Sequence, residues 1–179
     1  KVLKMEEAVY DVALSFEGSI TPIEKAALYE KYRSSKSILE LNKSTLRNIL
    51  GRGWTGRRFN PEEFIAKAKK IIPFIERAGI RTARFNDQRY PYGLRMIPDY
   101  PFMIYYRGNI DFDYYRSIAI VGTREPDEIG LKRTSGFTVE LVKNGFTVVS
   151  GLAHGIDSCA HGACVDNGGK TIAVLGCGI

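Results

Sequence analysis

The chain has 179 residues, enough for one domain with a good core or for one core and a small second domain. Apolar residues make up 44% and charged residues 26%, which is typical of folded globular proteins and excludes disordered or fibrous classes. No stretch reaches the roughly 18 apolar residues of a membrane span, and segment 1–10 is too charged for a signal-peptide core, so we expect a cytoplasmic location. Three cysteines without zinc-site or disulfide spacing predict no metal site: Cys159, Cys164 and Cys177.

The net charge of +6 is unevenly distributed along the chain. Residues 1–116 contain 21 basic and 14 acidic side chains, a net charge of +7, whereas residues 117–179 contain 5 basic and 6 acidic ones, a net charge of −1. A positively charged module attracts polyanions and is common in nucleic-acid-binding proteins. A basic surface that is merely solvated gives the same count, so charge alone leaves both readings open.

Residues 1–78 are predicted to form a small all-helical domain. Thr21-Pro22 supplies an N-cap and a proline at the first helical position, and apolar residues follow at helical spacing. The helical segments expected here run from Thr21, from Ser37, over Lys43–Leu50, and from Asn60 to Pro73.

A glycine-punctuated segment, 51–58, joins two of these helices and carries Arg52, Arg57 and Arg58. Glycines let a backbone approach phosphate closely, and guanidinium groups hold phosphate oxygens. The three arginines are therefore a second candidate DNA contact, similar to a helix-hairpin-helix. The alternative, which we favour, is a flexible connection with exposed arginines and with Trp54 folded onto its own helices.

Residues 79–115 are rich in proline and tyrosine and are predicted to form an extended connector. Residues that precede proline are restricted to extended conformations, and Phe102–Tyr106 is the best strand candidate. The aromatic side chains are suited to stacking on bases, but packing against the neighbouring domains is the favoured role.

From residue 116 the pattern is that of an α/β domain. The expected order is a buried strand at 117–121, a helix at 130–144, a strand at 146–149, a helix at 157–167 and a strand at 171–175. Short joints between these elements predict a Rossmann-like parallel sheet with helices on both faces. Three strands leave an apolar edge unpaired, so we expect the chain to be a piece of a longer protein.

Three glycine-bearing loops follow the strands, at 122–124, 150–157 and 176–178. Ligands of such sheets bind at the carboxyl ends of the strands, where backbone amides and helix N-termini attract anions. Gly122 and Gly151 are predicted to open the backbone to phosphate, with donors at Thr123, Arg124 and Ser150. The dinucleotide spacing Gly-x-Gly-x-x-Gly and a Gly-Lys-Ser/Thr loop are both missing, so no nucleotide cofactor is expected.

Several side chains near these loops have structural alternatives. An ion pair with Glu125 or Asp127 is the alternative to a phosphate contact for Arg124. Asp157 is expected to be the N-cap of the second helix. His161 is expected to hydrogen-bond a neighbouring loop, since no Ser or Cys is spaced for a catalytic triad.

The motifs of this half resemble those of the DNA processing protein A (DprA/Smf) family. The resemblance is carried by Ile118–Arg124, Val148–Asp157, Ala160-His161 and Gly168–Gly178. Further matches occur in the lead-in, at Asp87, Tyr90-Pro91, Leu94, Pro98, Pro101 and Gly108. By this resemblance, residues 116–179 would be the N-terminal half of the family's Rossmann-like domain, and residues 1–78 its sterile-alpha-motif-like domain.

The resemblance implies a non-enzymatic recombination mediator. Such a protein would bind and protect single-stranded DNA in natural transformation and help to load the RecA recombinase, as a homodimer. The DNA-binding positions that it implies are Gly122, Thr123, Arg124, Ser150, Gly151 and Gly155.

Two other functions are weighed against this one. A nucleotide-processing enzyme of the phosphoribohydrolase type shares such glycine loops, but its Pro-Gly-Gly-x-Gly-Thr motif is not found in residues 1–179. A sensor that binds a small nucleotide and signals through the helical domain is the third candidate.

Overall fold

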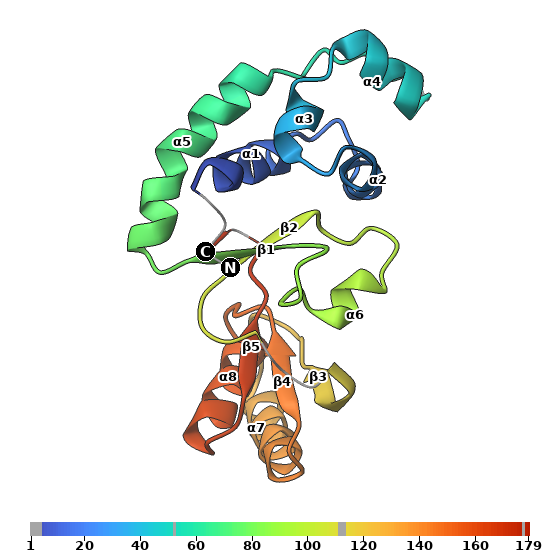
Figure 1. Cartoon of the computed structure of the whole chain (residues 1–179). Helices are drawn as coiled ribbons and strands as arrows, with labels where there is room; N and C mark the ends of the chain where they lie inside the picture. The colour runs from blue at the N-terminus through green and yellow to red at the C-terminus, as the bar shows by residue number, and fades with distance from the viewer. Residues whose placement is uncertain (1–4, 52, 111–113, 177) are drawn as a thin grey trace. The chain divides into compact units, whose positions relative to one another are not determined.

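The computed structural model describes residues 5–51, 53–110, 114–176 and 178–179. The chain divides into two compact units, Lys1–Gly108 and Asn109–Ile179 (Figure 1). The first unit therefore includes most of the stretch that the sequence pattern predicts to be a separate connector. Within the described residues, no helix combines the length and the apolar composition that a bilayer crossing requires.

The first unit is a helical bundle with a two-stranded sheet. Its elements are α1 (Met5–Ser15), α2 (Pro22–Tyr32), α3 (Ser35–Leu39), α4 (Lys43–Leu50), α5 (Pro61–Arg77), β1 (Arg81–Arg84), α6 (Tyr92–Arg95) and β2 (Met103–Tyr106). Helix α1 lies beside α5 and α3 (Figure 1) and contributes Val12, Ala13 and Leu14 to the core. The sequence pattern did not indicate this central helix.

Local signals explain where the helices begin. Thr21 and Glu24 form a complete capping box at the start of α2, with the Glu24 carboxylate 2.8 Å from the Thr21 amide. Asn42 caps α4, and Gly51 ends that helix in the left-handed conformation at φ 61°. The expected stop of α5 at Pro73 is wrong, because the helix continues to Arg77. Burial of Ile72 and Ile75 on either side of the proline compensates for the lost backbone hydrogen bond.

Strands β1 and β2 pair antiparallel, with Arg81 opposite Tyr106 and Arg84 opposite Met103. The predicted strand at 102–106 is thus confirmed to within one residue. The Tyr105 hydroxyl lies 2.9 Å from Ser15 Oγ on α1, so the strand pair is bound to the helical bundle. This contact explains why the segment after residue 78 belongs to the first unit.

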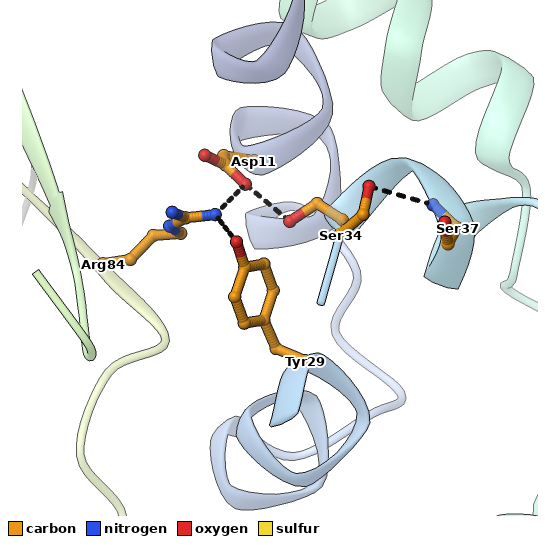
Figure 2. A network of polar contacts seen from close by, with 6 residues as sticks. Asp11, Tyr29, Ser34, Ser37 and Arg84 are labelled. Carbon is orange, nitrogen blue, oxygen red and sulfur yellow. Dashed lines mark hydrogen bonds and ion pairs between the residues drawn. The ribbon is translucent and has the colours of Figure 1, made fainter. Parts of the chain in front are cut away.

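A buried polar cluster also joins β1 to the helices (Figure 2). Asp11 is buried, with only 2% of its surface exposed. Its carboxylate accepts hydrogen bonds from Ser35 Oγ at 2.6 Å and from Arg84 Nη1 at 3.0 Å. The same guanidinium donates to the Tyr29 hydroxyl and lies over the Tyr29 ring. Burial raises the pKa of Asp11, and the Arg84 charge and the Ser35 hydrogen bond oppose this shift.

The second unit is an α/β domain with a parallel sheet of strand order β3-β4-β5. Its elements are η1 (Tyr114–Arg116), β3 (Ser117–Ala119), α7 (Glu128–Lys143), β4 (Thr147–Ser150), α8 (Ile156–Asp166) and β5 (Thr171–Ala173). All five expected strands and helices occur in the expected order, so the Rossmann-like parallel sheet is confirmed.

Helices α7 and α8 pack against each other and therefore lie on the same face of the sheet. The strands follow one another in chain order, so each right-handed crossover places its helix on that face. This face buries Val148, Ala160 and Cys164. In the part of the chain that the structure describes, no helix covers the other face, and Val121 and Val174, which follow β3 and β5, are exposed. The expected burial of strand 117–121 and the second helix layer are therefore not found among these residues.

Candidate functional site

The loops after β3 and β4 contact each other directly at the carboxyl edge of the sheet. The Ile156 amide, at the start of α8, donates to the Thr123 carbonyl at 3.1 Å. A side chain at Gly122 would have its Cβ 2.7 Å from Ile156 Cγ1, closer than such atoms approach. Glycine at this position therefore lets the first residue of α8 pack onto the loop after β3.

Gly155 forms the closest contact between the two loops. Its backbone has φ 84° and ψ −125°, a conformation that side chains with a Cβ rarely adopt. A Cβ on Gly155 would lie 2.3 Å from the Thr123 carbonyl oxygen and 2.8 Å from Arg124 Cα. Both the conformation and the space thus require glycine, and four predicted site residues lie together here: Gly122, Thr123, Arg124 and Gly155.

Arg124 is exposed, and no ion pair or hydrogen bond joins its guanidinium to any residue that the structure describes. The alternative ion pair with Glu125 or Asp127 is therefore not found. Asp127 instead caps α7, since its carboxylate accepts the Gly130 amide at 2.7 Å. Thr123 Oγ1 accepts the Glu125 amide at 3.2 Å, which leaves the hydroxyl hydrogen for another partner.

Ser150 and Gly151 have partners within the protein. Ser150 is buried, and its hydroxyl donates to the Ile120 carbonyl at 2.6 Å. The Gly151 amide donates to Asp157 Oδ2 at 3.1 Å, and a Cβ on Gly151 would lie 2.8 Å from that oxygen. The Ser150 hydroxyl, an expected phosphate donor, is thus bonded to the Ile120 carbonyl, and a phosphate contact of Ser150 and Gly151 stays a prediction.

Asp157 holds the loop after β4 in place. Helix α8 begins at Ile156 with Gly155 at the cap position, so the expectation that Asp157 is the N-cap is wrong. Its carboxylate reaches back to the amides of Gly151 and Ala153, at 3.1 and 3.5 Å. This role was missed because the sequence shows an acidic residue near a helix start but not which amides it faces.

Leu152 lies between the two amides that Asp157 binds. Its φ is 57°, a left-handed conformation that is unusual for leucine, and 53% of the residue is exposed. His154, two residues later, is also exposed. The loop thus presents an apolar and an imidazole side chain to solvent. No sequence signal distinguishes Leu152 from an ordinary core leucine.

His161 is a structural residue of α8. It is 7% exposed, and its Nδ1 lies 2.7 Å from Thr171 Oγ1 on β5. The Thr171 hydroxyl has one hydrogen and donates it to the Val148 carbonyl at 2.9 Å. Thr171 Oγ1 must therefore accept the hydrogen bond from His161, whose Nδ1 carries the donated proton. His161 thus has a structural hydrogen bond as expected, but its partner is the first residue of strand β5 and not a loop.

The cysteines occupy different environments. Cys164 is buried, and burial raises the pKa of its thiol, whereas Cys159 is half-buried. Cys177 lies outside the described residues. Among the residues that the structure does describe, no three His, Cys, Asp or Glu side chains are grouped closely enough to hold a metal ion.

The arginine-bearing loop of the first unit is built around Trp54. The indole is buried, its Nε1 donates to Ser19 Oγ at 2.9 Å, and its ring contacts Phe59 edge-on at 5.6 Å between centroids. The expected packing of Trp54 within its own unit is confirmed, whereas a DNA contact of the loop arginines stays a prediction. Arg57 and Arg58 are exposed, and Arg52 lies outside the described residues.

A parallel sheet with contacting glycine loops at its carboxyl edge defines a Rossmann-like α/β module, of the class that binds ligands at this edge. Residues 81–179 match the family model described as DNA recombination-mediator protein A. The chain belongs to this family of DNA-processing proteins.

Individual relatives agree with this assignment. The chain is 39% identical over 127 residues to Protein Smf of Synechocystis sp., an alignment that covers 66% of this chain and 32% of the relative. It is 42% identical over 93 residues to the DNA processing protein DprA of Streptococcus pneumoniae, which covers 52% of this chain and 33% of the relative. The chain thus spans about a third of the length of these relatives.

The fold is also similar to a solved structure. The X-ray structure of DNA processing protein A from Streptococcus pneumoniae superposes with a TM-score of 0.65 at 28% identity. The superposition covers 97% of this chain and 58% of that chain.

Proposed function

We propose that this chain is part of a recombination mediator that binds single-stranded DNA at the carboxyl edge of the β3-β4-β5 sheet. Gly122, Thr123, Arg124 and Gly155 form the phosphate contact. The family description, DNA recombination-mediator protein A, supports a role in recombination. We propose further that the protein acts in the cytoplasm as a homodimer, protects incoming DNA and helps to load the RecA recombinase in natural transformation.

The observation that carries the proposal is the Arg124 guanidinium. It is exposed, has no partner among the described residues, and follows two residues that contact the start of α8. A guanidinium binds phosphate through two parallel hydrogen bonds, and the N-terminus of α8 adds positive potential nearby. Ser150, Gly151 and Asp157 support this site by fixing the loop after β4.

An unpaired strand suits this edge better than a duplex. The exposed Leu152 and His154 side chains lie on the loop that contacts Thr123 and Arg124. Unpaired bases present apolar faces to which such side chains can pack, whereas the bases of a duplex are stacked on one another.

Fluorescence anisotropy with labelled DNA tests the proposal. The parent and Arg124→Ala are titrated with a single strand and with a duplex of the same sequence, at several salt concentrations. Lys170→Ala serves as the matched control, because it removes one exposed positive charge just before β5, at the opposite end of the strands.

We expect the parent to prefer the single strand and Arg124→Ala to bind it about 10- to 100-fold more weakly, as loss of a charged hydrogen-bond donor predicts. The slope of log affinity against log salt should fall by about 0.7, the value for one phosphate contact of a single strand. Equal affinities of the parent and Arg124→Ala contradict the proposal. Turnover of a mononucleotide would favour the phosphoribohydrolase-type enzyme instead.

A further inference from the structure

A groove of about 590 Å³ opens on the first unit between α1, α3 and the beginning of α5. All of its lining residues belong to this unit. Those that carry the argument are Tyr10, Lys36, Leu39, Lys43, Arg57 and Phe59. The volume lies within the range of small-molecule sites, about 300 to 1,000 Å³.

The groove has an apolar floor and one aromatic wall. Leu39 and Phe59 are each 3% exposed and belong to the core, so the floor is fixed by packing. Tyr10 is half-buried, and Lys36 Nζ lies 5.5 Å from the centroid of its ring. A flat ring beside an ammonium group is suited to a planar base that carries a phosphate.

The charges around the groove favour an anion. Lys36, Lys43 and Arg57 outnumber Glu40 and Glu62. Two helices also begin at the groove: Lys43 is the first residue of the eight-residue α4, and Pro61 is the first residue of the 17-residue α5. Helix N-termini carry partial positive charge, which adds to that of the side chains.

Two of the three cations are available to a ligand. Lys43 and Arg57 are exposed, and neither side chain forms an ion pair with any residue in the described part of the chain. Both lie close to Trp54. Arg57 belongs to the same loop, and Lys43 packs against that loop, since a Cβ on Gly56 would be 2.9 Å from the Trp54 ring and 3.3 Å from Lys43 Cδ.

We propose that this groove binds a nucleotide unit of single-stranded DNA, with the base against Tyr10 and the phosphate between Lys43 and Arg57. The proposal rests on the proposed function and adds to it a second DNA contact on the helical unit. An amphipathic peptide would also find an apolar floor here, but the excess of positive charge and the two helix N-termini favour nucleic acid.

Trp54 provides a local probe, because it is the only tryptophan of the chain. Its ring contacts Phe59, which lines the groove, at 5.6 Å between centroids. A ligand that settles on Phe59 should therefore change the emission of Trp54. DNA that binds only at Arg124 should leave that emission unchanged, which makes the two contacts distinguishable.

The experiment is a titration of the full chain with a short oligothymidylate, followed by Trp54 emission and by anisotropy of labelled DNA. The test variant is Lys43→Gln with Arg57→Gln. The control is Lys69→Gln with Lys70→Gln, which removes two exposed charges from α5 outside the groove. Circular dichroism verifies that both variants keep their helices.

We expect a saturable change of Trp54 emission in the parent and in the control. In Lys43→Gln with Arg57→Gln this change should be lost, and the salt slope should fall by about 0.7, the value for one phosphate of a single strand. Tyr10→Leu should weaken binding by about 5- to 100-fold with an unchanged slope, since it removes base stacking and no charge.

The groove contact and the Arg124 site can fail independently in these measurements. Binding seen by anisotropy without a change of Trp54 emission, and without loss in Lys43→Gln with Arg57→Gln, overturns the groove contact and leaves the Arg124 site standing. A Trp54 response that persists while Arg124→Ala binds like the parent supports the groove and counts against the Arg124 site. A Trp54 response to an amphipathic peptide but not to DNA also overturns the groove proposal.

Discussion

Replacing Gly155 with alanine perturbs the contact between the loops after β3 and β4. At φ 84° and ψ −125° a residue with a Cβ is strained by about 1–3 kcal/mol. The new Cβ would also lie 2.3 Å from the Thr123 carbonyl oxygen, whereas ordinary contacts are 3.4–4 Å. Both neighbours are backbone atoms, so the loop after β3 must shift, which adds about 1–3 kcal/mol, as in overpacked cores. We expect a total loss of about 4 kcal/mol.

Gly168→Ala is the matched control. Gly168 also has a positive φ, of 70°, but no atom lies within 4 Å of the position of its Cβ. Alanine there is strained by about 1 kcal/mol and collides with nothing. Urea unfolding followed by hydrogen exchange of the second unit compares the two variants, and the free energies of unfolding should differ by about 3 kcal/mol.

Gly155→Ala should also affect DNA binding, since the shift of the loop displaces Thr123 and Arg124. We expect weaker binding of single-stranded DNA by Gly155→Ala under conditions in which the protein is still folded, and parental binding by Gly168→Ala. Equal losses of stability in the two variants would show that the loops do not meet as described.

Two further predictions concern buried charges of the first unit. Arg84→Met should lower the free energy of unfolding by about 3 kcal/mol near neutral pH, because it leaves the buried Asp11 carboxylate without its counter-charge. The loss should shrink in urea titrations at lower pH, where Asp11 is protonated, and a pH-independent loss would contradict this reasoning. Burial lowers the pKa of Lys25 to about 8, partly opposed by Glu17, so between pH 8 and 10.5 the unfolded state binds more protons. The unfolding free energy of the parent should therefore rise with pH relative to Lys25→Met, by up to about 3 kcal/mol, and a fall would refute the assigned burial.

The α/β unit could be predicted from sequence because its signals are local. Apolar runs that end in glycine mark β3 and β4, and the helical spacing between them marks α7. The first unit was harder to predict. Helix α1 is buried on several sides, as Val12, Ala13 and Leu14 show, and its Asp11 and Ser15 bond to Arg84 and Tyr105, distant partners that a local pattern does not reveal.

Within the site, the residue types were predictable but their partners were not. The glycines at 122 and 155 were recognised, but their closest contacts are with Ile156 and with the Thr123 carbonyl, which a linear pattern does not reveal. Asp157 was expected at the cap of α8 and instead binds the Gly151 amide. Which amide a carboxylate reaches depends on the path of the loop, and that path is set by packing.

The closure of the first unit by β1 and β2 determines how this protein can be divided and made. Ser15 and Tyr105 are 90 positions apart, and Asp11 and Arg84 are 73 positions apart, so α1 acquires these partners only after both strands have been synthesised. A piece that ends at residue 78 would retain helices α1 to α5 yet lack both strands and the only guanidinium that Asp11 contacts in the described residues. An excised helical unit should therefore extend to Gly108.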